Sequence, residues 1–343
     1  MRSSRETLPP GAYVLFSAVL LAVLCLCVCV GSIALTPGQI LHILKSAVLH
    51  EPQENAQAAA ILLNVRLPRV LCTALVGASL SLCGGAMQGL LKNPLADGST
   101  LGVSSGASLG AVLAIAVGFS LPRLPFAGTV VLSVLFAFAS LLIILFLSYR
   151  LDRSLETNTI ILVGVIFSMF ASALISTVIA FASEKVKTIT FWTMGSLQGS
   201  TYRNALLLTS ALAVCGSVIL LHGKILNAFA VGEENARSIG VDVKRAKLLL
   251  LITVSVLIGV CVSVSGSIGF VGLVTPHIVR LISGPNHRRL LPASMFGGAV
   301  FLLLSDLLAR VIASPAELPL GVVTGFFGAI VFVVILFRRK KGF

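Results

Sequence analysis

Long apolar stretches alternate with short polar segments along almost the whole chain. A helix needs about 20 apolar residues to cross the hydrocarbon core of a membrane, so each stretch predicts one span. The third and eighth stretches are short and rich in glycine, serine or proline. They hold matching positions in two five-span halves, which is typical of an internal repeat with a pathway between its halves. The ten predicted spans cover residues 12–35, 60–91, 101–118, 126–149, 158–183, 205–221, 247–265, 269–283, 290–312 and 319–337.

One polar segment, residues 222–247, stands apart from this pattern between the sixth and seventh spans. It holds 8 charged residues in 26, against 37 in 343 for the chain. Its own pattern allows two interpretations. It is either a docking surface for a partner or a solvated connector between two spans.

Residues 232–240 within this segment predict a helix of two turns. Acidic residues occupy its start, where the helix dipole is positive, and Arg237 lies near its end. Gly240 follows, as suits the left-handed position after a helix. Ala236 and Ile239 are three residues apart, so we expect them to form one buried face.

The composition excludes a soluble globular protein, with 57% hydrophobic residues, 11% charged residues and a mean hydropathy of +1.05. The net charge of +13 follows from topology rather than from nucleic-acid binding. With the N-terminus inside, 17 of the 25 basic residues lie on the inner side. Both termini and segment 222–247 are then cytoplasmic. The first span is too long for a signal peptide, and we expect a retained helix.

The seven cysteines all lie inside predicted spans. Cys25, Cys27 and Cys29 alternate along one of them. Residues two apart point in nearly opposite directions on a helix, so this spacing does not form a metal motif. We expect the cysteines to be small apolar packing residues, without a disulfide framework.

Two overlapping Gly-x-Ser-x-Gly sequences, Gly102 to Gly106 and Gly106 to Gly110, match the nucleophile elbow of serine hydrolases. That motif requires a turn from a strand into a helix, with histidine and acidic partners. Here it begins a predicted membrane helix. The small residues therefore indicate close helix packing.

Several polar residues lie in or near the predicted spans. Arg66 and Arg69 lie at the outer mouth of the second span, where they could bind lipid phosphates or an acidic partner. Asp306 and Arg310 are spaced to pair along the ninth span, and Arg310 reaches the same outer face. Gln88 is costly in lipid and should face protein or a water-filled path.

Three separated motif groups together resemble one family. They are Arg66-Leu-Pro-Arg69 with Gly85-Ala-Met-Gln88 and Asn93-Pro-Leu-Ala; Leu226-Asn227 with Gly232-Glu233 and Ala236; and Gly269-Phe-Val-Gly-Leu with Pro276-His277 and Arg280. Asp306, Arg310 and Glu317-Leu-Pro-Leu-Gly321 fit as well. The ordered set closely resembles the FecCD-type permeases of ABC importers for iron-siderophore, haem and cobalamin. The resemblance covers nearly the whole chain.

The resemblance implies an all-α polytopic membrane protein with the type II ABC importer permease fold and about ten transmembrane helices. Residues 1–343 would form a single permease domain in the cell membrane. A second permease subunit, identical or different, two cytoplasmic ATPases and an extracytoplasmic substrate-binding protein would complete the importer. The chain would be no enzyme and would bind no cofactor or metal. It lacks a Walker motif, so ATP–Mg would bind to the partner ATPase.

The resemblance also assigns roles to individual residues. It assigns coupling to the ATPase to Leu226, Asn227, Gly232, Glu233, Glu234, Ala236, Arg237, Ile239 and Gly240. It assigns docking of the binding protein to Arg66, Arg69 and Arg310. The gate and pathway set is Gln88, Asn93 and Leu95, with Thr157 and Asn158 opposite. Gly98, Asn286 and Ile330 depart from the family pattern, which leaves the gate geometry open.

The favoured cargo is a ferric siderophore, the commonest cargo of the family, with cobalamin or haem as alternatives. A secondary transporter would need buried ionisable groups on its path, and only Asp306 and Asp97 qualify. An intramembrane serine hydrolase would need Ser104 or Ser108 as its nucleophile.

Overall fold

The computed structural model describes residues 7–31, 35–53, 55–98, 100–120, 127–153 and 156–340. Within these ranges the chain forms helices and no β-strand. Both chain ends, which we predicted to be cytoplasmic, lie outside the described residues. The helices are α1 (Pro10–Cys29), α2 (Pro37–Leu49), α3 (Ala56–Ile61), η1 (Leu62–Arg66), α4 (Leu67–Leu90), α5 (Val103–Val117), α6 (Ala127–Leu151), α7 (Thr157–Phe181), η2 (Ser183–Lys185), α8 (Val186–Thr193), α9 (Tyr202–Ala211), η3 (Leu212–Gly216), α10 (Ser217–Leu221), α11 (Gly223–Val231), α12 (Glu233–Ser238), α13 (Val243–Ser265), α14 (Val271–Ser283), α15 (His287–Val311) and α16 (Leu320–Lys340).

Ten of these helical units match the ten predicted spans. Seven are long and apolar enough to cross a membrane, and the shorter apolar helices α5, α14 and α16 complete the set in the described chain. The all-α polytopic fold is therefore confirmed. Two units run through a π-helical turn, η1 before α4 and η3 between α9 and α10.

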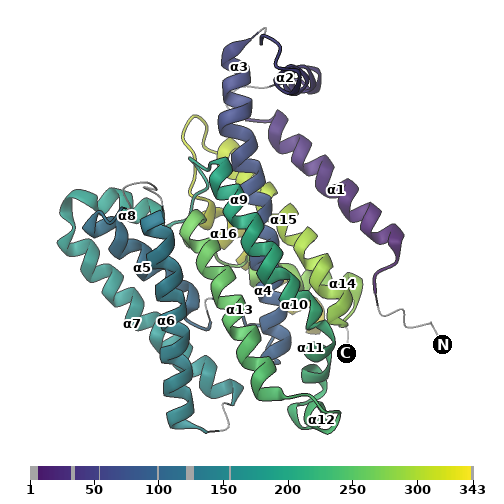
Figure 1. Ribbon diagram of the computed structural model, residues 1–343, viewed down its shortest axis with the longest axis vertical. Helices are drawn as coiled ribbons and strands as arrows, with labels where there is room; N and C mark the ends of the chain where they lie inside the picture. Colours follow the sequence, from purple (N-terminus) through teal and green to yellow (C-terminus); the bar gives the residue numbers. More distant parts are fainter. Residues whose placement is uncertain are drawn as a thin grey trace.

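Helix α4 lies at the centre of the molecule, between α15, α14, α13 and α9 (Figure 1). Glycines allow this close packing. A Cβ atom on Gly77 would overlap the backbone of Gly298 in α15, and one on Gly84 would overlap Gly272 in α14. Close approach of helix backbones gains van der Waals contact, which is a main source of helix association in lipid. The small residues of the second span serve packing, as predicted.

Helices α5, α6, α7 and α8 form a second group at one side of α13 (Figure 1). The overlapping Gly-x-Ser-x-Gly sequences lie here in α5. Gly102 has φ +72° and precedes α5, while Gly106 and Gly110 contact Ser140 and the backbone at Leu132 in α6. These small residues pack one helix against another, which confirms the packing interpretation.

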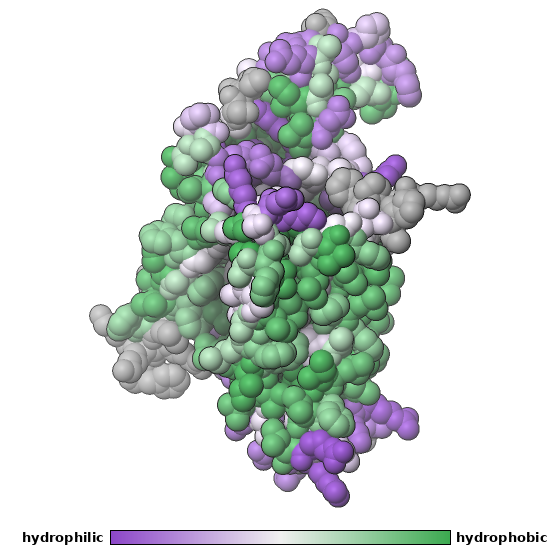
Figure 2. Space-filling model, turned by 90° about the vertical axis from the view of Figure 1, so that its left-hand side faces the viewer, coloured by the Kyte–Doolittle hydropathy of each residue, from purple (hydrophilic) through white to green (hydrophobic). Residues whose placement is uncertain are grey.

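The two ends of the molecule carry its polar segments. Helices α2 and α3 lie at one end, the α2 end, and α11 and α12 lie at the other, the α12 end (Figure 1). Between the ends a broad apolar belt covers the visible face (Figure 2). The belt agrees with a protein that spans a membrane.

Candidate functional site

Segment 222–247 forms two short helices, where we predicted one. The first, α11, was missed because only two of its nine residues bury an apolar side chain, Leu226 at 0% exposed and Phe229 at 1% exposed. The second, α12, ends at Ser238 and is shorter than predicted. Gly240 follows with φ +86°, as its predicted left-handed position requires.

Asn227 links α11 to the beginning of α15. Its Nδ2 donates a hydrogen bond of 2.8 Å to Oδ1 of Asn286. Its Oδ1 accepts one of 2.8 Å from the backbone N–H of His287 and lies 2.9 Å from Nδ1 of the same histidine. One side chain therefore contacts both the backbone N–H and the ring Nδ1 at the first residue of α15.

His287 in turn contacts α4. The residue is 3% exposed, and a Cβ atom on Gly89 would overlap its imidazole ring. Gly89 lies one residue before the end of α4, and the chain continues directly to Asn93 and Leu95. The structure thus joins α11, the start of α15 and the end of α4 through one buried ring.

Helix α12 is attached to α13 by an ion pair and presents the rest of its surface outward. Nζ of Lys247 lies 3.0 Å from Oε1 of Glu233, and Ala236 is 0% exposed. Ile239, which we predicted to be buried with Ala236, is 72% exposed. That prediction is wrong because the helix ends before Ile239, which therefore leaves the buried face. Glu234 and Arg237 are exposed as well.

The predicted gate residues lie at the same α12 end. Asn93 Oδ1 accepts a hydrogen bond of 2.9 Å from the N–H of Leu95, which closes a tight turn after α4. Leu95 is 47% exposed. Thr157 and Asn158 begin α7, whose first turn also lies at this end (Figure 1). Their opposition in a gate stays a prediction.

Gln88 lies inside the protein. It is 3% exposed, and its Nε2 donates a hydrogen bond of 3.1 Å to the carbonyl of Leu273 in α14. Nη2 of Arg280 approaches its Oε1 at 3.4 Å. We predicted that Gln88 faces either protein or a water-filled path, and in the structure it faces protein. The role of Gln88 in a pathway stays a prediction.

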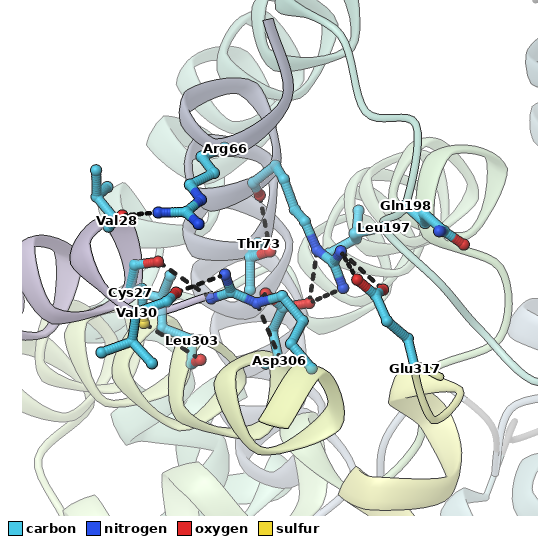
Figure 3. A network of polar contacts seen from close by, with 12 residues as sticks. Cys27, Val28, Val30, Arg66, Thr73, Leu197, Gln198, Leu303, Asp306 and Glu317 are labelled. Carbon is cyan, nitrogen blue, oxygen red and sulfur yellow. Dashed lines mark hydrogen bonds and ion pairs between the residues drawn. The ribbon is translucent and has the colours of Figure 1, made fainter. Parts of the chain in front are cut away.

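Two arginines at the α2 end, Arg69 and Arg310, form a network with the acids Asp306 and Glu317, and Arg66 lies nearby (Figure 3). Arg69 donates to Oδ1 of Asp306 at 2.9 Å and to Oε2 of Glu317 at 2.9 Å. Nε of Arg310 lies 3.1 Å from Oδ2 of Asp306, which confirms the pairing predicted along α15. Asp306 is 1% exposed. Its two carboxylate oxygens lie against Arg69 and Arg310, so both arginines neutralise this buried charge.

The arginines also bind the carboxyl end of α1. Arg66 donates to the carbonyl of Val28 at 3.0 Å, and Arg310 donates to those of Val30 at 3.1 Å and Cys27 at 3.2 Å (Figure 3). The last carbonyls of a helix lack partners within the helix and favour cations. In this conformation the three arginines hold α1, α4 and α15 together. Docking of a partner by these arginines stays a prediction and would require an exchange of partners.

Sequence reasoning missed the Asn227–Asn286–His287 contact and the role of Lys247. One signal was present, because asparagine is favoured directly before a helix and Asn286 precedes α15. The contact between residues 227 and 287 depends on tertiary structure, and no local pattern predicts it.

Residues 19–338 match the FecCD transport family. The chain is 46% identical over 282 residues to the uncharacterized ABC transporter permease protein YvrB of Bacillus subtilis, covering 82% of this chain and 80% of the relative. It is 39% identical over 286 residues to the cobalamin import system permease protein BtuC of Halobacterium salinarum, covering 82% and 75%. It is 40% identical over 286 residues to the hemin transport system permease protein HmuU of Yersinia pestis, covering 82% and 84%.

The fold is also similar to a solved structure, that of a transporter assigned to the metal-chelate ABC type in an inward-facing conformation. The superposition gives a TM-score of 0.84 at 31% identity and covers 96% of this chain and all of the other.

Proposed function

Because the chain belongs to the FecCD transport family and is the permease of an ABC importer, we propose that its cargo is a metal chelate, in the first place a ferric siderophore. The similarity to a transporter of the metal-chelate type supports this class. Haem and cobalamin are the alternatives, because relatives at 40% and 39% identity are named for them. The chain itself would perform no chemistry.

The cargo is identified by mass spectrometry of the ligand that copurifies with the complete importer and its binding protein. We expect a ferric siderophore, and uptake into proteoliposomes should depend on ATP. Copurified haem or cobalamin would contradict the siderophore proposal and leave the permease role intact. Uptake that survives loss of ATP and stops with an uncoupler would instead indicate a secondary transporter.

The α12 end would face the cytoplasm. Basic residues are concentrated in the segments at this end, as the positive-inside rule requires of cytoplasmic loops. They include Arg150, Arg153, Lys224, Arg237, Lys244, Arg245, Arg288 and Arg289. The α2 end would then meet the substrate-binding protein.

Two exposed apolar helix faces support a second permease subunit. On α7, Leu162, Met169 and Phe170 are 59%, 69% and 59% exposed, and on α16, Phe326 and Ile330 are 63% and 48% exposed. Both faces must be covered by lipid or by protein. Packing of two permease subunits along α7 and α16 would enclose a path between them.

The ATPase would dock on α11 and α12. One observation supports this proposal. These two helices bind other helices of the chain on one side and are exposed on the other. Inward, Asn227 and Glu233 bind α15 and α13, and outward, Ile239 and Arg237 are exposed. A movement imposed on the outer surface would reach the end of α4 through His287. ATP–Mg would be held by the ATPase.

Replacing Ile239 by Asp tests this docking. Because Ile239 is 72% exposed, we expect the change to alter the free energy of unfolding by less than about 0.5 kcal/mol. We expect the amount of ATPase that copurifies to fall several-fold, since a charge would be buried in the interface. The matched control is Leu41→Asp in α2, because Leu41 is 71% exposed at the opposite end. Equal ATPase recovery from both variants would overturn the assignment.

A further inference from the structure

A cavity of about 360 Å³ lies beside α12, between the end of α6, the beginning of α7 and the beginning of α13. The ATPase docking proposed above involves two of its lining residues, Glu233 and Arg237, and assigns no ligand to the cavity itself. Its walls differ strongly in character, because one part is basic and the other part is apolar. The two parts meet where α6 and α13 reach the α12 end.

The basic part consists of Arg153, Arg237, Lys244 and Lys247. Among the lining residues, Glu233 is the one acid, and it is bound to Lys247 at 3.0 Å. The lining therefore carries a formal excess of three positive charges. The positive charges within this cavity repel each other. An anion bound among them would be stabilised, because it attracts each cation and offsets their repulsion.

Two of these cations are positioned at the rim. Lys244 Nζ lies 5.8 Å from the ring centroid of Tyr149 in α6, a distance typical of a cation–π contact. Tyr149 is 45% exposed, and Lys244 and Arg153 are exposed as well. The ammonium and guanidinium groups are therefore accessible to a ligand that arrives from outside the chain.

The apolar part continues into the surface of the membrane spans. Leu145 in α6 and Leu248 and Leu251 in α13 line it. Leu248 is 45% exposed, and Leu142, which lies one turn before Leu145 on the same face of α6, is 49% exposed, so the wall is continuous with residues that face lipid. A free inorganic anion has no apolar surface to bury against this wall, whereas an acyl chain would bury apolar surface there.

We propose that this cavity binds an anionic phospholipid, with its phosphate among Arg153, Arg237 and Lys244 and an acyl chain along the leucines of α6 and α13. Basic pockets between spanning helices on the cytoplasmic side suit anionic headgroups. The proposal rests on the proposed orientation, with the α12 end in the cytoplasm, and does not depend on the cargo. The bound headgroup would connect α12 to α13 and to Arg153, which follows α6, and would thus adjust how firmly α12 is held.

The test uses the full-length permease purified with its ATPase, delipidated, and titrated with phosphatidylglycerol or phosphatidylcholine under native mass spectrometry. We expect phosphatidylglycerol to bind preferentially. In the variant Arg153→Gln with Lys244→Gln it should bind roughly 10- to 30-fold more weakly, since each basic residue near a membrane surface contributes about five-fold to the affinity for an anionic lipid. The matched control is Arg245→Gln, because Arg245 is a neighbouring exposed cation that pairs with Asp242 outside this cavity.

Three results would overturn the proposal. The first is equal binding of the two lipids. The second is protection from thermal unfolding by inorganic phosphate at the concentrations at which phosphatidylglycerol protects, because that would indicate a simple anion site. The third is lipid binding by the permease alone that disappears when the ATPase is added, because the cations would then belong to the protein interface.

Discussion

Replacement of Arg69 by Met is expected to lower the free energy of unfolding by about 3 kcal/mol, the lower end of the range for one partner lost from a buried ion pair. Arg69 is 8% exposed and binds both Asp306 and Glu317. Without it, Asp306 would keep only Arg310, and Glu317 would lose its partner in the network. The measurement is thermal and denaturant unfolding of the full-length chain in detergent.

Two controls separate this effect from a general loss of charge. Arg245→Gln removes the cation of an exposed pair with Asp242, whose side chains are 90% and 54% exposed, and should cost less than about 1 kcal/mol. Adding Glu317→Gln to Arg69→Met should recover part of the lost stability, because it removes the carboxylate that loses its partner, whereas Asp306 keeps Arg310. If Arg69→Met unfolds like Arg245→Gln, the network does not stabilise the fold.

The same network bears on docking at the α2 end. Arg66 and Arg310 hold the last carbonyls of α1, and Arg69 holds Glu317, whose side chain is 33% exposed. A partner that presents carboxylates there would compete with Glu317 for Arg69. Such an exchange would change the attachment of α1, α4 and α15 at this end, so docking and helix packing would be coupled.

The ten spans could be predicted because hydropathy is a property of consecutive residues. The pair Asp306 and Arg310 could be predicted for the same reason, since four residues separate them on one helix. The ion pair of Arg69 with Asp306 joins residues 237 apart in sequence, and it depends on the crossing of α4 and α15. Helix α11 is short, and its burial against α4 and α15 has no local signal. Ile239 was misplaced because its position depends on where α12 ends.

Replacement of Gly89 by Ala is expected to reduce transport per ATP hydrolysed by about ten-fold. The added methyl group would overlap the ring of His287, which is 3% exposed and held by Asn227. Displacing the ring breaks hydrogen bonds worth roughly 1 to 2 kcal/mol, and about 1.4 kcal/mol corresponds to ten-fold. Assembly and ATP hydrolysis should persist, because the outer surface of α12 is unchanged. The measurement is uptake and phosphate release in the same proteoliposomes.

Gly11→Ala is the matched control, because a Cβ atom at Gly11 in α1 would meet no atom within 4 Å. It should transport normally. If Gly89 acts through the ring, adding Gly89→Ala to His287→Ala should cause no further loss, since residues in contact are not additive. An additive loss would mean that Gly89 affects α4 by another route. Equal transport by the Gly89 and Gly11 variants would remove His287 from the connection between α11 and the end of α4.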